Sequence, residues 1–122
     1  MLRVKRIYEA KSPEDGRRYL VDRLWPRGLS KEKAGLDAWL KELAPSDALR
    51  KWFHHDPDNW EAFVQRYREE LSDPAVLPLL EKLRGQAREG VVTLLFSARN
   101  VQRNNAVCLK AILEEDGSPA MA

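Results

Sequence analysis

Two polar segments of the sequence hold the side chains best suited to ligand chemistry. The first combines cations with one carboxylate, one indole and one glycine: Asp22, Arg23, Trp25, Arg27, Gly28 and Lys31. The second offers a hydroxyl, guanidinium groups and amides: Ser97, Arg99, Asn100, Arg103, Asn104 and Asn105. Guanidinium forks and amides bind phosphate or carboxylate oxygens, and a glycine lets the backbone approach a ligand closely. Together the two segments predict an anion-binding site.

Each segment lies at the end of a predicted strand. Residues 91–97 form an apolar run without alternation, which is typical of a strand buried on both faces of a parallel sheet. Residues 19–25 form a second β-like run, and Pro26 stops it because proline lacks the amide hydrogen that a central strand needs. In open α/β sheets, ligands bind beyond the carboxyl ends of the strands. If the two strands are neighbours, the two segments form one basic cleft.

A purely structural interpretation of the same residues stays open. Arg23 and Arg27 can pair with Asp22 or with the acidic middle of the chain. Ser97 and Asn100 can cap the last helix. On this interpretation the two segments stabilise the fold and bind no ligand.

Capping residues and apolar spacing predict the helices of the first half. Ser30 caps a short turn through Lys33. Apolar side chains at helical spacing predict a helix over residues 36–44. Ser46 precedes a further short helix over residues 47–53, with an acidic residue in its first turn.

Two Asp-Pro pairs predict the next helix starts. Asp56 and Asp73 are each followed by proline, which is favoured at the first helical position, and an apolar stripe follows each pair. The second of these helices ends at Gly85 or Gly90. A polar loop at residues 98–102 leads into the last helix.

The order of these elements predicts the fold class. A β-compatible stretch at residues 4–8 precedes the second strand, several helices lie between that strand and the buried one, and one helix follows the buried strand. We therefore expect an α/β fold, a single compact domain with a small, largely parallel sheet flanked by helices. The domain is expected to span residues 1–116, with a flexible tail at 117–122.

Composition supports one globular domain, and the distribution of charge gives a nucleic-acid-binding surface as a further hypothesis for function. The chain has 122 residues, of which 43% are hydrophobic and 33% charged, and this balance excludes general disorder. The net charge is only +2, but residues 1–33 contain ten basic and five acidic side chains. Such a block can form a nucleic-acid surface, and Trp25 beside it can stack on a base.

Histidine and cysteine give weaker candidates. His55, beside Asp56, is a candidate acid or base, and Asp22 is another. We expect no metal site, because the chain has two adjacent histidines and one cysteine and no HExxH pattern. Cys108 lies inside the last predicted helix, where it is expected to be a small core residue and not a nucleophile.

Other patterns limit cofactor and location. No glycine motif of the P-loop or dinucleotide type occurs, so no cofactor is expected. A single cysteine cannot form an intramolecular disulfide, and no segment approaches the roughly 20 apolar residues that span a bilayer. These patterns favour a cytoplasmic protein without a membrane partner.

Several motifs together resemble one family. The sequence has LVDRLWPRG at residues 20–28, LAPS at 43–46, HDP at 55–57 and TLLFSA at 93–98. These motifs are similar to those of the domain-of-unknown-function family 488, in its short YeaO-like bacterial members. The resemblance extends from about residue 3 to residue 113 and implies an α/β fold in a small cytoplasmic bacterial protein.

The resemblance also implies site positions. The matching motif residues are Asp22, Arg23, Arg27, Gly28, Ser46, Arg50, Tyr67, Ser97 and Asn104. It further implies that residues 39–44 are extended and that Ser46 ends a strand, so strand and helix both stay open for this segment. Longer relatives carry cysteines, a histidine and a glutamate near Ser97 and Asn104, and this chain lacks them. The resemblance therefore favours anion binding over thiolate chemistry.

Three hypotheses for function result. The leading one is binding of a small anionic ligand, phosphate-bearing or nucleotide-like, in the basic cleft. The second is a hydrolase or transferase that acts on a phosphorylated or nucleobase substrate and uses Asp22 or His55. The third is a nucleic-acid-binding module that uses residues 1–33.

Overall fold

The fold is a four-stranded parallel sheet with helices on both sides. The structure is a computed structural model, and it describes residues 1–115. The strands are β1 (Leu2–Arg6), β2 (Arg17–Leu20), β3 (Ala38–Trp39) and β4 (Val92–Phe96). They lie in the order β1-β4-β2-β3, and every neighbouring pair is parallel. The predicted class, a single compact α/β domain with a small parallel sheet, is confirmed. The tail predicted at 117–122 lies outside the described residues, and the domain limit at 116 stays a prediction.

Strand β4 is the centre of the sheet. All five of its residues are buried, as its uninterrupted apolar run predicts. Leu94 pairs with Val4 of β1 on one side and with Tyr19 of β2 on the other. The two strands that were expected to carry the polar segments, β2 and β4, are therefore direct neighbours.

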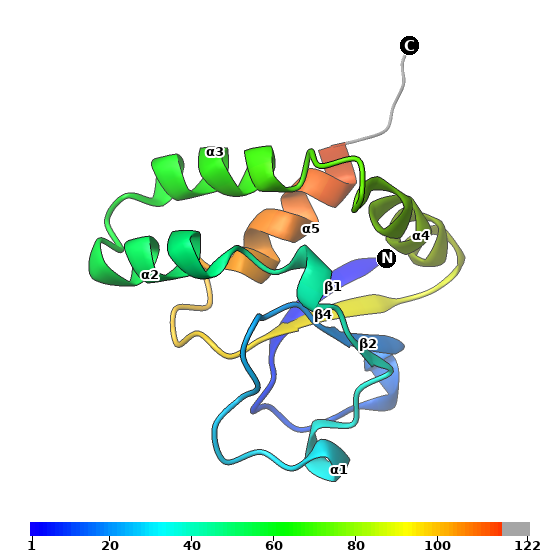
Figure 1. Cartoon of the computed structure of the whole chain (residues 1–122). Coiled ribbons are helices and arrows are strands. Elements are labelled where there is room, and N and C mark those ends of the chain that lie inside the picture. Colours follow the sequence, from blue (N-terminus) through cyan, green and yellow to red (C-terminus); the bar gives the residue numbers. More distant parts are fainter. Residues whose placement is uncertain (116–122) are drawn as a thin grey trace.

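The two faces of the sheet are covered differently (Figure 1). Helices α2 (Asp47–His55), α3 (Trp60–Glu70), α4 (Leu77–Glu89) and α5 (Asn105–Glu115) lie on one side, and the short helix α1 (Lys31–Ala34) lies on the other. Successive side chains of β4 point to opposite faces, so Leu94 joins the larger core and Leu95 the smaller one. None of the described helices is long and apolar enough to cross a membrane.

The smaller face also buries an ionic network, which we call the buried ion cluster: Asp15, Arg18 and Lys5. Asp15 and Arg18 are each 1% exposed. Arg18 Nη1 lies 2.5 Å from Asp15 Oδ2, and Lys5 Nζ lies 3.1 Å from Asp15 Oδ1. The Arg18 guanidinium also donates to two backbone carbonyl oxygens at the end of α1. Burial alone raises the pKa of Asp15, but hydrogen bonds from Ser12, Lys5 and Arg18 outweigh it and hold that pKa below its ordinary value of 3.8.

Two predicted helix caps are confirmed. Ser30 Oγ accepts a hydrogen bond from Lys33 N at the start of α1. Ser46 Oγ accepts one from Leu49 N at the start of α2. Each hydroxyl satisfies one of the free amides of a first helical turn.

The two Asp-Pro pairs do not begin helices, so those predicted starts are wrong. Asp56 ends α2, and its carbonyl and carboxylate both accept hydrogen bonds from Asn59, which leaves α3 to begin at Trp60. Asp73 Oδ1 accepts from the amide two residues later, and α4 begins at Leu77. The side chain of Asp73 thus forms a turn with the backbone two residues on, and Asp56 forms a turn with Asn59, so neither carboxylate caps a helix at its own position. The helix α4 continues through Gly85 and ends before Gly90.

The segment 36–44 is neither the predicted helix nor a long strand. Residues Ala38–Trp39 form β3, and Lys41–Leu43 form the 3₁₀-helix η2. The amides of Asp37 and Leu40 donate to β2 carbonyls, so pairing with the sheet outweighs the local helical spacing. Ser46 does not end a strand, because it caps α2.

The second strand ends earlier in the chain than predicted. It was expected over residues 19–25, but β2 is Arg17–Leu20. The amide of Val21 still bonds to Leu95 O, and the chain leaves the sheet at Asp22. Residues 22–25 are thus free to line a site at the edge of the sheet.

Candidate functional site

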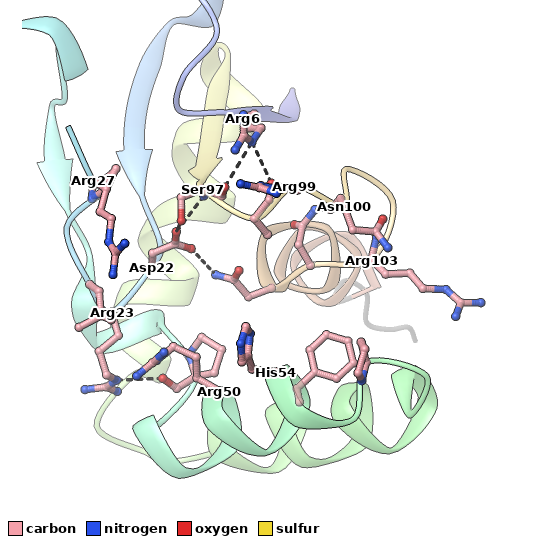
Figure 2. A pocket seen from close by; sticks show the side chains of 18 of the residues that line it. Arg6, Asp22, Arg23, Arg27, Arg50, His54, Ser97, Arg99, Asn100 and Arg103 are labelled. Carbon is pink, nitrogen blue, oxygen red and sulfur yellow. Dashed lines mark hydrogen bonds between the residues drawn. The ribbon is translucent and has the colours of Figure 1, made fainter. Parts of the chain in front are cut away.

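A cleft of about 1260 Å³ lies beyond the carboxyl ends of β1, β4 and β2. It is lined by side chains from the loops after β2 and β4, from the end of β1 and from α2 (Figure 2). Ligand clefts of proteins have volumes of several hundred to about 1,000 Å³, so this one is large enough for a small molecule. The expected convergence of the two polar segments is present in the structure.

The cleft contains most, but not all, of the predicted site residues. Those that line it are Asp22, Arg23, Arg27, Arg50, Ser97, Arg99, Asn100 and Asn104, together with Trp25, Arg103 and Asn105. Those that do not line it are Gly28, Lys31, Ser46, Tyr67 and His55. The first group contains all six residues of the second polar segment and four of the first, whereas Gly28 and Lys31 of the first segment lie outside the cleft.

The residues outside the cleft have structural surroundings of their own. Lys31 lies in α1, on the other side of the sheet. Gly28 has a φ of 72°, which a glycine adopts without strain. Tyr67 is fully buried and donates to Leu43 O, and this burial raises the pKa of its hydroxyl well above 10.0. The hydroxyl and amide of Ser46 donate to the carboxylate of Glu70.

Asp22 holds the two loops together. Its Oδ2 accepts hydrogen bonds from Ser97 N and Ser97 Oγ, each 2.8 Å long, and its Oδ1 accepts one of 3.1 Å from Asn105 Nδ2. Asn105 Nδ2 also donates to Val21 O. Burial raises the pKa of the Asp22 carboxyl, and the bonds from Ser97 and Asn105 reduce that effect without cancelling it. The carboxylate thus fixes the ends of β2 and β4 against the start of α5.

The arginines do not pair with Asp22, so that structural interpretation is wrong. Arg23 Nε donates to Pro45 O at 2.9 Å, and its Nη2 reaches Ala44 O at 3.5 Å. Ion pairing with Asp22 is unnecessary because neutral donors already occupy both carboxylate oxygens. Arg23 instead fastens the loop after β2 to the segment that precedes α2.

Asn104 caps α5, so the interpretation of Ser97 and Asn100 as its caps is also wrong. Asn104 Oδ1 accepts a 2.9 Å hydrogen bond from Val107 N, and its Nδ2 donates to Asn100 O. Asn100 Oδ1 accepts from the amides of Gln102 and Arg103 in the preceding turn. Asn104 therefore uses both of its side-chain atoms for the fold while lining the cleft.

Three exposed arginines line the cleft without a protein partner. Within residues 1–115, the guanidinium groups of Arg27, Arg99 and Arg103 form no hydrogen bond or ion pair. Arg50 contacts Asp47 at 3.3 Å, but its Nε is buried and has no hydrogen-bond partner among the described residues. These four side chains supply unsatisfied donors and positive charge to the cleft.

Sequence reasoning missed several side chains of the cleft. Arg6 ends β1, and its Nε donates to the carbonyls of Ser97 and Ala98. The signal for Arg6 was its position at the end of a strand parallel to β4. His54 lines the cleft in place of His55, and Phe53 lies beside it on α2. No local pattern distinguishes the two histidines, because their orientation depends on how α2 packs.

Trp25 has structural contacts as well as a place in the cleft. Its Nε1 donates to Leu29 O at 2.6 Å, and its ring meets Trp39 edge-on with centroids 5.3 Å apart. These contacts pack the loop after β2 against the smaller core. They also fix one wall of the cleft.

Among residues 1–115, no group of three or more His, Cys, Asp or Glu side chains lies together. Cys108 is buried in α5, as predicted, and burial raises the pKa of its thiol to about 11. A thiol with that pKa is protonated at neutral pH and is a poor nucleophile.

The fold and the site define a small α/β domain with an arginine-lined cleft at the carboxyl edge of its sheet. Residues 1–120 match the family described as the inactive DUF488-N3 subclade, and the chain belongs to this family. The resemblance to family 488 is thereby confirmed. No solved structure matches the chain significantly.

Two similar bacterial proteins are both named as uncharacterized. The uncharacterized protein Rv3073c of Mycobacterium tuberculosis is 45% identical over 112 residues, which cover 92% of each chain. The uncharacterized protein YeaO of Escherichia coli is 40% identical over 108 residues, which cover 88% of this chain and 92% of YeaO. The similarity to these two proteins thus covers most of the chain and is not confined to the motifs.

Proposed function

We propose that the protein binds a small anionic, phosphate-bearing ligand in the arginine-lined cleft. The observation that carries the proposal is the set of partnerless guanidinium groups of Arg27, Arg99 and Arg103. Guanidinium forks bind phosphate oxygens through paired, charge-assisted hydrogen bonds. The oxygens of a phosphate-bearing ligand are acceptors of the kind that these side chains lack within the fold.

The charge balance of the cleft supports an anion. Six arginines line it, namely Arg6, Arg23, Arg27, Arg50, Arg99 and Arg103, and Asp22 is the one carboxylate among the lining residues. Neutral donors hold that carboxylate, so it does not neutralise the arginines directly. A cleft lined by charges of one sign concentrates ligands of the opposite sign.

Binding is favoured over catalysis. The family is described as inactive, and His55 does not line the cleft. Both oxygens of Asp22 accept hydrogen bonds from the fold, which leaves the carboxylate poorly placed to move a proton.

A nucleic-acid surface on residues 1–33 has less support. Lys5 and Arg18 belong to the buried ion cluster, and Arg3 donates to Glu14 O. These cations serve the fold, so the basic excess of this segment is only partly available to a partner.

We also propose that the protein is cytoplasmic, because a chain with a single cysteine has no intramolecular disulfide to require an oxidising compartment. Fractionation of cells that produce the tagged protein tests this location. Recovery in the cytosolic fraction is expected.

Calorimetric titration and thermal shift test ligand binding. Inorganic phosphate, ribose 5-phosphate, adenosine 5′-monophosphate and citrate are the probes, each at low and physiological salt. A ligand at a hundred times its dissociation constant adds about 2.7 kcal/mol to stability, which is a readable shift. We expect at least one phosphate compound to bind.

Matched variants locate the binding. The double variant Arg27→Gln/Arg99→Gln should lose the response, because the substitutions remove two partnerless guanidinium groups. Arg17→Gln changes an exposed arginine of β2 that does not line the cleft and should retain it. An equal response in both proteins, or no response to any phosphate compound, contradicts the proposal.

A further inference from the structure

We propose that the ligand of the cleft is a nucleoside phosphate, with its phosphate at one end and its base at the other. This inference rests on the proposed function and names the class of ligand. It follows from the different chemistry of the two ends of the cleft, which we call the anion end and the ring end. Arg23, Arg27 and Arg50 define the anion end, and Phe53, His54 and Pro57 define the ring end.

The anion end offers guanidinium groups with unused donors. Arg23 is fixed by its Nε bond to Pro45 O, and its Nη1 has no hydrogen bond to the described residues. Arg27 has no side-chain partner within residues 1–115, and Arg50 Nε is buried without one. Figure 2 shows these three arginines on the same side of the cleft. A fixed guanidinium beside two further ones suits a group with several negative oxygens.

The ring end is aromatic and apolar. Phe53 lies on α2, stacks on Phe63 with ring centroids 4.4 Å apart, and also contacts the ring of Trp60, with centroids 5.9 Å apart. His54 is exposed and lines the cleft next to Phe53, and Pro57 follows in the loop after α2. A planar base can stack on such side chains, and every base has a face for this contact.

Helix α2 connects the two ends. It begins at Asp47, two residues after Pro45, the partner of Arg23, and it carries Phe53 in its last turn. Arg50 of the anion end precedes Phe53 by three residues, about 4.5 Å along the helix axis at the usual rise of 1.5 Å per residue, and Arg23 is held beyond the start of the helix. The ligand that uses both ends therefore has separate anionic and ring parts.

Arg103, on the opposite wall of the cleft, supports the same orientation of the ligand, with its base at the ring end. Arg103 has no partner within residues 1–115, and Figure 2 shows it on the side of His54 away from Arg23 and Arg27. A guanidinium plane also stacks on bases. Asp22 disfavours a phosphate at its own position by repulsion, so the phosphate is directed to the anion end. Inorganic phosphate or a sugar phosphate leaves the ring end empty.

Titration calorimetry with matched probes tests the inference on the full chain. The probes are the four common nucleoside 5′-monophosphates, ribose 5-phosphate, adenosine and inorganic phosphate. We expect at least one nucleotide to bind about ten-fold or more tightly than ribose 5-phosphate and than adenosine, because it alone occupies both ends.

Three variants locate the ring contact. His54→Ala removes an exposed ring from the cleft, and His55→Ala removes its neighbour, which does not line the cleft. Phe53→Leu keeps the side chain apolar while it removes the ring. We expect His54→Ala and Phe53→Leu to reduce the preference for the nucleotide over ribose 5-phosphate by about three-fold or more, and His55→Ala to leave it unchanged.

The outcomes separate the two proposals. Ribose 5-phosphate that binds as tightly as every nucleotide overturns the ring end and leaves the proposed function in place. Failure of every phosphate compound to bind overturns both. An equal preference in His54→Ala and His55→Ala overturns the ring end even if Phe53→Leu fails to fold, which circular dichroism reveals.

Discussion

The buried ion cluster and the arginine-lined cleft contrast two uses of arginine in one small domain. In the cluster, Arg18 is 1% exposed and is bonded to Asp15 and to backbone carbonyls. In the cleft, Arg27 and Arg99 are exposed and have no partner within residues 1–115. The two regions lie on the same sheet, so the difference comes from the partners that each region supplies.

The difference identifies which charges serve the fold and which are available to a ligand. A buried charge requires a partner, because its removal from water is costly. Exposed arginines bear no such cost and gain a partner when an anion binds. Asp22 is intermediate, since it is a partly buried carboxylate that neutral donors satisfy.

Arg18→Met gives the largest expected effect. It leaves the buried Asp15 with Lys5 as its remaining cationic partner, so we expect a loss of about 3–5 kcal/mol of unfolding free energy. Urea unfolding followed by circular dichroism measures it. Arg17→Met, on the exposed neighbour in the same strand, is the control. Equal midpoints for the two variants contradict a structural role for the cluster.

Asp22→Asn is expected to have an intermediate effect. An amide presents one oxygen, so its nitrogen must face a donor of either Ser97 or Asn105. One buried donor is then left without a partner, at a cost of about 1–3 kcal/mol. Asp58→Asn, at an exposed position, is the control. A stability like that of the control indicates that Asp22 does not join the two loops.

The two carboxylates are expected to give opposite pH dependences. The folded-state pKa of Asp15 lies below 3.8, so its contribution to stability is present above that pH and is lost as the pH falls below it. The folded-state pKa of Asp22 is raised, so its contribution is largest below 3.8 and decreases as the pH rises through the raised pKa. Unfolding midpoints measured across this range test both signs.

Single variants show which carboxylate causes each change of stability with pH. Asp15→Asn should remove the loss of stability on the acid side of 3.8. Asp22→Asn should remove the gain that occurs as the pH is lowered towards 3.8. If either variant keeps the slope of the original protein, the corresponding group is not its source.

Arg27→Gln and Arg99→Gln give the smallest expected effect on stability. Neither guanidinium has a partner within residues 1–115, so each change should alter the unfolding free energy by no more than about 0.5 kcal/mol. Thermal unfolding without ligand measures this difference. A loss as large as that of Arg18→Met removes the contrast between the two regions.

The fold could be predicted where local pattern and tertiary role agree. The apolar run at residues 91–97 indicated β4, because a strand buried on both faces needs no polar positions. Ser30 and Ser46 correctly indicated helix starts, because a capping hydroxyl bonds to an amide within the same turn and needs no distant partner. The pairs at Asp56 and Asp73 misled because their side chains bond into turns that precede the helices.

The site could be predicted in part. Asp22, Arg23 and Ser97 directly follow or end predicted strands, and parallel neighbours bring such residues to one edge. His54 and Phe53 reach the cleft only through the packing of α2, which no local spacing describes. Resemblance alone added Arg50, which lines the cleft, and Tyr67, which is buried in the core, because a motif position can serve either core or site.

The order of the strands has a consequence for synthesis of the chain. β1 and β2 each pair with β4 and not with each other. On the ribosome, β1 therefore has no strand partner until residues 92–96 have emerged, and β2 has only the two-residue strand β3. Such distant pairing slows folding and exposes strand edges to aggregation. Arg3, Arg6 and Arg17 place positive charge on β1 and β2, and charges of this kind disfavour association of unpaired strand edges.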